Sequence, residues 1–314
     1  MNPTTSRPTR RTLVTAAAAA TLAAALPSGA QPAPQAAGDY TPIRGQPGKD
    51  VVWIATPDQM VTRLLQLAAV TARDTVIDLG SGDGAIVIAA ARDFKARALG
   101  IEYKPELVEL SKHNAQRAGV AERTEFIRGD IFEASFANAT VVTMYLLPAI
   151  NLRLRHILMA MKPGTRVVSH DFDMGDWEAD ERTRGGSHSA HLWVVPANAG
   201  GEWRVRFALR GGPTEARLAI EQKFQKIRGQ VQFDGFENTL REPRLLGDQI
   251  AFAFTDSDGV MRDFRGRVTG SRMSGTVATA TGLPTPFSAE RPGAAPPLPG
   301  SAPVDQAQID AAAL

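Results

Sequence analysis

From Trp53 onward, the chain alternates between short apolar runs rich in β-branched residues and longer stretches in which apolar residues recur every three or four positions. The first pattern is typical of buried strands, and the second of helices that cover a sheet. The predicted strands are 75–79, 98–103, 124–128, 140–147 and 165–172, and the predicted helices are 84–94, 105–118 and 149–161. One more helix is expected after Thr56-Pro57-Asp58, with Thr56 as its capping residue. This alternation predicts an α/β fold with a doubly wound, parallel sheet.

The pattern changes after Trp203. Apolar and polar residues then alternate at 217–233, 244–255 and 264–277, and turn sequences such as Asp258-Gly259 separate these runs. A period of two that is broken by tight turns predicts a small antiparallel β domain, either a barrel or a sandwich. The Pro/Ala-rich residues from Arg291 onward are expected to be disordered.

The first thirty residues have the composition of a targeting segment. They contain the pair Arg10-Arg11, an apolar run from Leu13 to Leu26 and no acidic residue. This pattern resembles a twin-arginine export signal, so a periplasmic or exported protein is expected. The alternative is a disordered basic tail on a cytoplasmic protein. The apolar run is shorter than the roughly 20 residues of a membrane helix, so no transmembrane helix is expected in the mature chain.

These patterns divide the chain into five predicted parts. They are a signal segment at 1–30, a linker at 31–50, the α/β domain at 51–199, the β-rich module at 200–290 and the tail at 291–314.

Composition removes several classes of protein. The 314 residues include no cysteine, which excludes disulfides, thiolate zinc sites, iron–sulfur clusters and cysteine nucleophiles. The net charge is +2, and it falls to −1 when the three arginines of the first thirty residues are left out. Because this balance offers no basic face for phosphates, no nucleic-acid partner is expected.

The segment Asp78-Leu79-Gly80-Ser81-Gly82-Asp83-Gly84 carries the clearest chemical signal. It joins a predicted strand to a predicted helix, where glycines let the backbone turn tightly and approach a ligand closely. The same letters fit the dinucleotide pattern G-x-G-x-x-G/A, with Ala85 in the last place. The glycines alone therefore leave an NAD-dependent oxidoreductase open.

Three acidic residues lie at the carboxyl ends of three consecutive predicted strands, which meet at one edge of a parallel sheet. Asp78 precedes the first glycine, where it could face an ammonium group but would repel the pyrophosphate of a dinucleotide. Glu102, followed by Tyr103, stands about 20 residues after the glycine turn, a spacing that suits the two hydroxyls of a ribose. Asp130, followed by Ile131, could accept a hydrogen bond from an adenine amino group.

In motif order and spacing, residues 53–177 resemble the class I S-adenosylmethionine (SAM)-dependent methyltransferases. The resemblance implies a Rossmann-like sheet and SAM as the cofactor. It also implies that the glycine loop wraps the methionine part of SAM, that Glu102 and Tyr103 lie at the ribose, and that Asp130 and Ile131 lie at the adenine. More narrowly, Tyr145-Leu146-Leu147-Pro148 resembles the mitochondrial lysine methyltransferases of the ATP synthase c-subunit and the adenine nucleotide translocase, as do 78–86 and 166–169. The β-rich module is foreign to those enzymes.

The predicted chemistry is methyl transfer to an amine. Such a transfer is an in-line displacement, so the protein mainly aligns an acceptor in its neutral form. Tyr145, after the fourth strand, and Thr56, near the glycine loop, are the candidate catalytic residues. Leu146 and Leu147 predict an apolar acceptor slot, which favours a neutral amine. Protein lysine is the favoured acceptor, with a small molecule as the alternative.

Two other interpretations are open. Because SAM is made in the cytoplasm, an exported protein could instead be a non-enzymatic binding protein on a methyltransferase fold. Polar residues around the fifth strand could also bind a metal, namely His170, Asp171, Asp173, Asp176, His188 and His191. Such alternation more often marks a strand end with solvated acids, and His188 and His191 lack an evident third ligand. No metal is therefore predicted.

Overall fold

A computed structural model describes residues 40–209 and 212–312. The predicted signal segment and the first part of the predicted linker lie outside these residues. The described residues belong to one compact unit. Among them, no helix is both long enough and apolar enough to cross a membrane.

The first sheet has seven strands in the order β3-β2-β1-β4-β5-β7-β6. Its parallel strands are β1 (Thr75–Leu79), β2 (Arg97–Glu102), β3 (Thr124–Arg128), β4 (Val141–Met144) and β5 (Arg166–His170). All five were predicted, with ends that differ by at most three residues. β1 lies next to both β2 and β4, so the chain reverses its direction of travel across the sheet beside β1. Such a reversal is where open α/β sheets bind ligands.

The first sheet has an antiparallel edge that the sequence did not predict. β7 (His188–Val194) pairs antiparallel with β5, and β6 (Glu181–Gly185) pairs antiparallel with β7. β6 is polar and mostly exposed, so it carries no apolar run by which the sequence would reveal a strand. The sheet is therefore mixed, with a hairpin beside β5.

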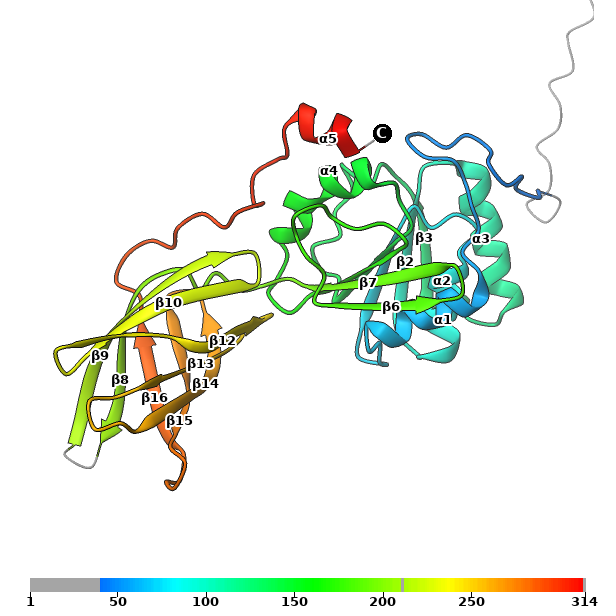
Figure 1. Ribbon diagram of the computed structural model, residues 1–314. Coiled ribbons are helices and arrows are strands. Elements are labelled where there is room, and N and C mark those ends of the chain that lie inside the picture. Colours follow the sequence, from blue (N-terminus) through cyan, green and yellow to red (C-terminus); the bar gives the residue numbers. More distant parts are fainter. Residues whose placement is uncertain (1–39, 210–211, 313–314) are drawn as a thin grey trace, which may run out of the picture. The chain divides into compact units, whose positions relative to one another are not determined.

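Helices cover both faces of this sheet (Figure 1). α1 (Asp58–Leu67), α2 (Ala85–Asp93) and α3 (Pro105–Arg117) contribute to one apolar cluster, and α4 (Pro148–Met159) to another. Along β1, Val76 belongs to the first cluster and Ile77 to the second, because successive strand residues point to opposite faces. Thr56 does not cap α1: the capping position is held by Pro57, with no side-chain hydrogen bond.

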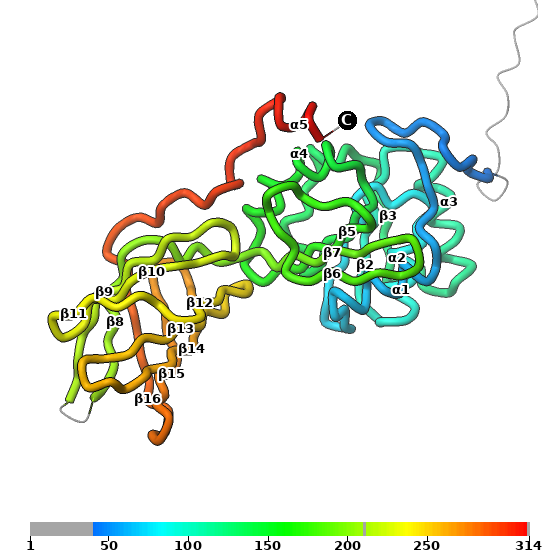
Figure 2. Tube along the Cα trace, viewed as in Figure 1, coloured from blue at the N-terminus to red at the C-terminus, as the bar shows by residue number. Residues whose placement is uncertain are grey.

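The second sheet has nine strands in the order β11-β10-β9-β8-β16-β15-β14-β13-β12 (Figure 2). The strands are β8 (Gly201–Leu209), β9 (Gly212–Lys223), β10 (Lys226–Phe233), β11 (Phe236–Thr239), β12 (Arg241–Leu246), β13 (Gln249–Thr255), β14 (Met261–Thr269), β15 (Arg272–Ala278) and β16 (Thr285–Glu290). Neighbours pair antiparallel, as predicted. Leu240, between the two edge strands, donates its N–H to Gly229 O of β10 at 2.9 Å. The sheet thus nearly closes into a barrel, and its interior is filled by phenylalanines such as Phe254 and Phe264.

The tail is more structured than predicted. Arg291 is buried, its guanidinium donates to Gly200 O at 2.6 Å, and it lies over the Trp203 ring at 4.7 Å. Further along, Gln306–Ala312 forms α5. The expectation of disorder from Arg291 onward is therefore wrong for these residues, because a Pro/Ala-rich composition does not reveal single anchoring contacts.

Candidate active site

The glycine loop follows β1 directly and leads into α2. Gly80, Gly82 and Gly84 have φ values of 76°, 55° and 85°, in the left-handed region that favours glycine. A Cβ at Gly82 would lie 2.7 Å from Trp53 Nε1, and one at Gly84 would lie 2.9 Å from the Phe126 ring. The loop therefore needs glycine both for its backbone conformation and for its close neighbours.

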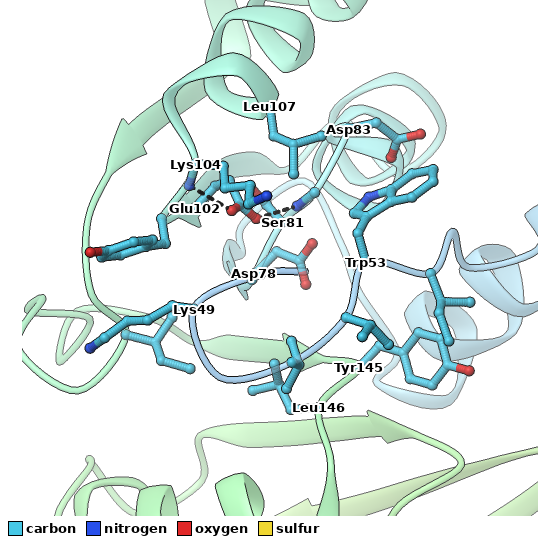
Figure 3. A pocket seen from close by; sticks show the side chains of 18 of the residues that line it. Lys49, Trp53, Asp78, Ser81, Asp83, Glu102, Lys104, Leu107, Tyr145 and Leu146 are labelled. Carbon is cyan, nitrogen blue, oxygen red and sulfur yellow. Dashed lines mark hydrogen bonds between the residues drawn. The ribbon is translucent and has the colours of Figure 1, made fainter. Parts of the chain in front are cut away.

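A cavity of about 960 Å³, including its mouth, opens at the carboxyl ends of β1, β2, β3 and β4 (Figure 3). The sequence-predicted residues that line it are Thr56, Asp78, Gly80, Ser81, Gly82, Asp83, Glu102, Tyr103, Asp130, Ile131 and Tyr145. Gly84 is not part of the lining, since it turns the chain into α2. The structure thus brings all the other candidate residues to one place.

Asp78 lies at the centre of this group (Figure 3). Its carboxylate is 3% exposed and accepts a hydrogen bond from Thr143 Oγ1 at 2.6 Å. Burial raises the pKa of Asp78 to about 7, and the nearby Glu102 and Asp83 carboxylates act in the same direction. Such a carboxylate is stabilised in its charged form when a cation enters the cavity.

Glu102 also lines the cavity, at the carboxyl end of β2. Its two carboxylate oxygens accept separate backbone N–H groups, Gly82 N at 3.0 Å and Lys104 N at 2.9 Å. These bonds hold the side chain between the glycine loop and the start of α3. Burial nevertheless raises the pKa of Glu102 above its usual value. The carboxylate is therefore oriented by the backbone before any ligand arrives.

Asp130 has a partner that the sequence did not predict. Its carboxylate forms an ion pair with Lys49 and accepts the Phe132 N–H at 3.0 Å. Partial burial acts to raise the pKa of Asp130, but Lys49 and the Phe132 N–H hold it below its usual value. Asp130 is thus ionised, and the Lys49 ammonium lies 5.5 Å from the Tyr103 ring centre.

Lys49 belongs to a segment, residues 48–56, that lines the cavity along its whole length. The start of this segment, 48–50, lies in the part predicted as a linker, and the rest precedes the first predicted helix. The bridge between Pro47 and Val52 shapes its start, and Trp53 packs against the glycine loop. Only a weak feature of the sequence indicated that this segment lines the cavity: the apolar Trp53 follows a Pro/Gly-rich stretch.

The residues after β4 form the apolar end of the cavity. Tyr145, Leu146 and Ile150 line it, whereas Leu147 is 43% exposed and does not. The apolar lining here is therefore supplied by Leu146 and Ile150, whereas the sequence predicted Leu146 and Leu147. Burial raises the pKa of Tyr145, and Asp171 adds to this effect, so its hydroxyl stays protonated at neutral pH. Tyr145 can orient an acceptor but cannot serve as a base.

The polar residues after β5 separate into two groups. His170, Asp171 and His188 have side-chain ligand atoms within 4.8 Å of one another. Asp176 instead pairs with Arg155 at 2.6 Å, and His191 Nε2 lies 3.1 Å from Ser189 Oγ. His188, at the start of β7, thus lies beside His170 and Asp171 at the end of β5, the strand with which β7 pairs.

Comparisons with known proteins agree on one class of enzyme. A family model described as the ANTKMT methyltransferase domain matches residues 78–181. A protein-lysine N-methyltransferase of Saccharolobus islandicus (strain REY15A) is 40% identical over 151 residues, which cover 46% of this chain and 94% of that relative. The ATP synthase c-subunit lysine N-methyltransferase of Mus musculus is 33% identical over 129 residues, 41% of this chain and 52% of that relative.

A solved structure, described as an RNA methyltransferase from Salinibacter ruber in complex with S-adenosyl-L-homocysteine, is also similar. It is 50% identical, with a TM-score of 0.45, and the match covers 45% of this chain and 94% of that chain. The present chain thus spans nearly all of the Saccharolobus relative but only about half of the mouse relative.

Proposed function

This chain belongs to the SAM-dependent methyltransferases with an ANTKMT-type domain, and on that premise we propose that it methylates the side-chain nitrogen of a lysine in a protein. The comparisons give no support to the NAD-dependent oxidoreductase that the glycine pattern left open. Membership of this family does not specify the methyl acceptor. The proposal that the acceptor is lysine rests on the acceptor end of the cavity and on the names of the relatives.

The cavity fits SAM in chemistry. SAM carries an ammonium and a sulfonium, and five carboxylates line the cavity, among them Asp78, Glu102 and Asp130. Ser81 Oγ is buried without a hydrogen-bond partner among the described residues, which suits a polar ligand group. We propose that Asp78 holds the ammonium, Glu102 the ribose hydroxyls and Asp130 the adenine end. When bound, SAM supplies a methyl group on a positively charged sulfur.

The apolar acceptor end is the observation that carries the proposal of lysine. Leu146 is 3% exposed and Ile150 6%, so this end offers little solvation to a charged ammonium. Such surroundings lower the pKa of an entering lysine and favour its neutral amine, whose lone pair forms the new C–N bond as the S–C bond breaks. The extra amine proton then passes to water. The Tyr145 ring flanks the entering side chain and fixes its direction.

Labelled SAM, incubated with the protein and a lysate of the source cells, tests this proposal. We expect label in a protein band, and we expect that band to be lost with Tyr145→Ala but kept with Phe236→Ala, an exposed aromatic of the β-rich module. Label found in nucleic acid alone would reject a protein acceptor.

We also propose that residues 1–30 direct export. The support is the pair Arg10-Arg11, the apolar run behind it and the absence of acidic residues. A twin-arginine route carries folded proteins, so SAM could travel in the cavity. In this proposal the predicted parts 51–199 and 200–290 act as the enzyme and an appended module.

A further inference from the structure

Three polar side chains meet where β5 ends beside the β6–β7 hairpin. His170 is the last residue of β5, Asp171 follows it, and His188 begins β7. Asp171 Oδ2 lies 2.7 Å from His188 Nδ1 and 3.4 Å from His170 Nε2. One carboxylate oxygen thus stands between two imidazole nitrogens.

His170 is the residue of this cluster whose ring nitrogens lack a partner among the described residues. It is fully buried, and neither of its ring nitrogens has a hydrogen-bond partner among the described residues. A buried polar group without a partner is costly, and native structures rarely keep one without a ligand, a water or a functional role. An ordinary ion pair between Asp171 and His188 accounts for two members of the cluster but leaves His170 unsatisfied.

Backbone contacts hold Asp171 in position. Asp171 has a φ of 61°, unusual for a residue other than glycine, and this conformation turns the chain at the end of β5. Asp171 N donates to Ser189 O at 2.8 Å, and Ser189 N donates to Asp171 Oδ1 at 2.7 Å. One carboxylate oxygen is thereby fixed by the β7 backbone, and the other is left facing the two histidines.

We propose that His170 Nε2, Asp171 Oδ2 and His188 Nδ1 bind a divalent transition-metal ion of the zinc class. Imidazole with one carboxylate suits zinc and its neighbours rather than magnesium or calcium, which prefer oxygen ligands. The His188 side chain is 34% exposed, which gives the ion a way in from solvent.

The site adjoins the cavity without being part of its lining. The ring centres of Tyr145 and His170 are 3.8 Å apart, while neither His170, Asp171 nor His188 lines the cavity. An ion there would fix the surface against which Tyr145 packs. The proposal concerns metal binding alone and does not depend on the identity of the methyl acceptor.

Titration of the full, tag-free chain with ZnCl₂ after chelator treatment tests the site, and CoCl₂ provides a second, optical reading. We expect one ion per chain and the visible absorption of cobalt bound in a low-symmetry site. Asp171→Asn and His188→Ala should each weaken zinc binding by more than about 100-fold, beyond the 10–100-fold effect of outer-shell changes. His113→Ala, on α3, is the matched control and should bind zinc like the wild type.

Asp171→Asn keeps the shape of the side chain, so it decides the matter if His188→Ala does not fold by circular dichroism. Absence of stoichiometric zinc binding in the wild type would overturn the proposal. Equal zinc affinity in Asp171→Asn and wild type would overturn it as well.

Discussion

Replacement of Asp78 by asparagine tests whether the buried carboxylate of Asp78 lowers the stability of the protein when SAM is absent. The asparagine side chain would keep the shape of the aspartate and could still accept the hydrogen bond from Thr143 Oγ1, but it carries no charge. The pKa of Asp78 is raised from 3.8 to about 7 because the group is buried. At about 1.4 kcal/mol per pH unit, ionising Asp78 costs about 4 kcal/mol more in the ligand-free fold than in the unfolded chain.

The sign of the pH dependence follows from this shift. The folded protein holds the Asp78 proton between pH 3.8 and about 7, where the unfolded chain has lost it. The free energy of unfolding contributed by Asp78 therefore falls as pH rises through this window and stays low above it. Without SAM, Asp78→Asn should be more stable than the wild type, and its advantage near pH 8 should exceed that near pH 5 by about 3 kcal/mol.

Urea unfolding of the SAM-free protein at these two pH values measures the effect, with Glu122→Gln as an exposed control that should follow the wild type. Saturating SAM should stabilise the wild type far more than Asp78→Asn, because only the carboxylate can pair with the ammonium. An Asp78→Asn variant that is equally or less stable than the wild type near pH 8 would show that the buried Asp78 carboxylate does not destabilise the ligand-free fold.

Three other predictions follow from the same structure. Glu102→Ala should weaken SAM binding by about 1–3 kcal/mol in calorimetry, because two oriented carboxylate oxygens are lost; unchanged affinity would reject its assignment to the ribose. A chain ending at Ala199 should keep its SAM affinity, since all cavity-lining residues lie within 48–150. It should melt at a lower temperature, because Trp177 loses its stacking on Phe224. A truncated chain that folds but does not bind SAM would show that the β-rich module completes the site. Arg10-Arg11→Lys-Lys should abolish export in cell fractionation, and a wild type that is wholly cytosolic and full length would reject the signal.

The parts of the site that the sequence predicted are local in the chain. The Asp78–Gly84 turn, its strand and its helix are contiguous, so spacing alone places the glycines. Glu102 and Asp130 were accessible to prediction because each lies at the carboxyl end of a predicted strand, and parallel strands bring their carboxyl ends to one edge.

The parts that the sequence missed depend on long-range contacts. Lys49 reaches Asp130 across 81 residues from a segment without periodicity, so no local pattern reveals the pair. The cluster of His170, Asp171 and His188 exists only because β7 pairs with β5. The exposed, polar β6 hides that hairpin in the sequence, which explains why His188 was not placed beside His170 and Asp171.

We propose that the methyl group of SAM is transferred to a lysine of a protein. Peptide mapping by mass spectrometry, after incubation with methyl-labelled SAM and a lysate of the source cells, locates the modified atom directly, with Glu102→Ala, at a SAM concentration that does not saturate it, as the comparison with weakened SAM binding. We expect label on the side-chain nitrogen of lysine, present with the wild type and greatly reduced with the variant. Label confined to another side chain, a small molecule or nucleic acid would contradict it.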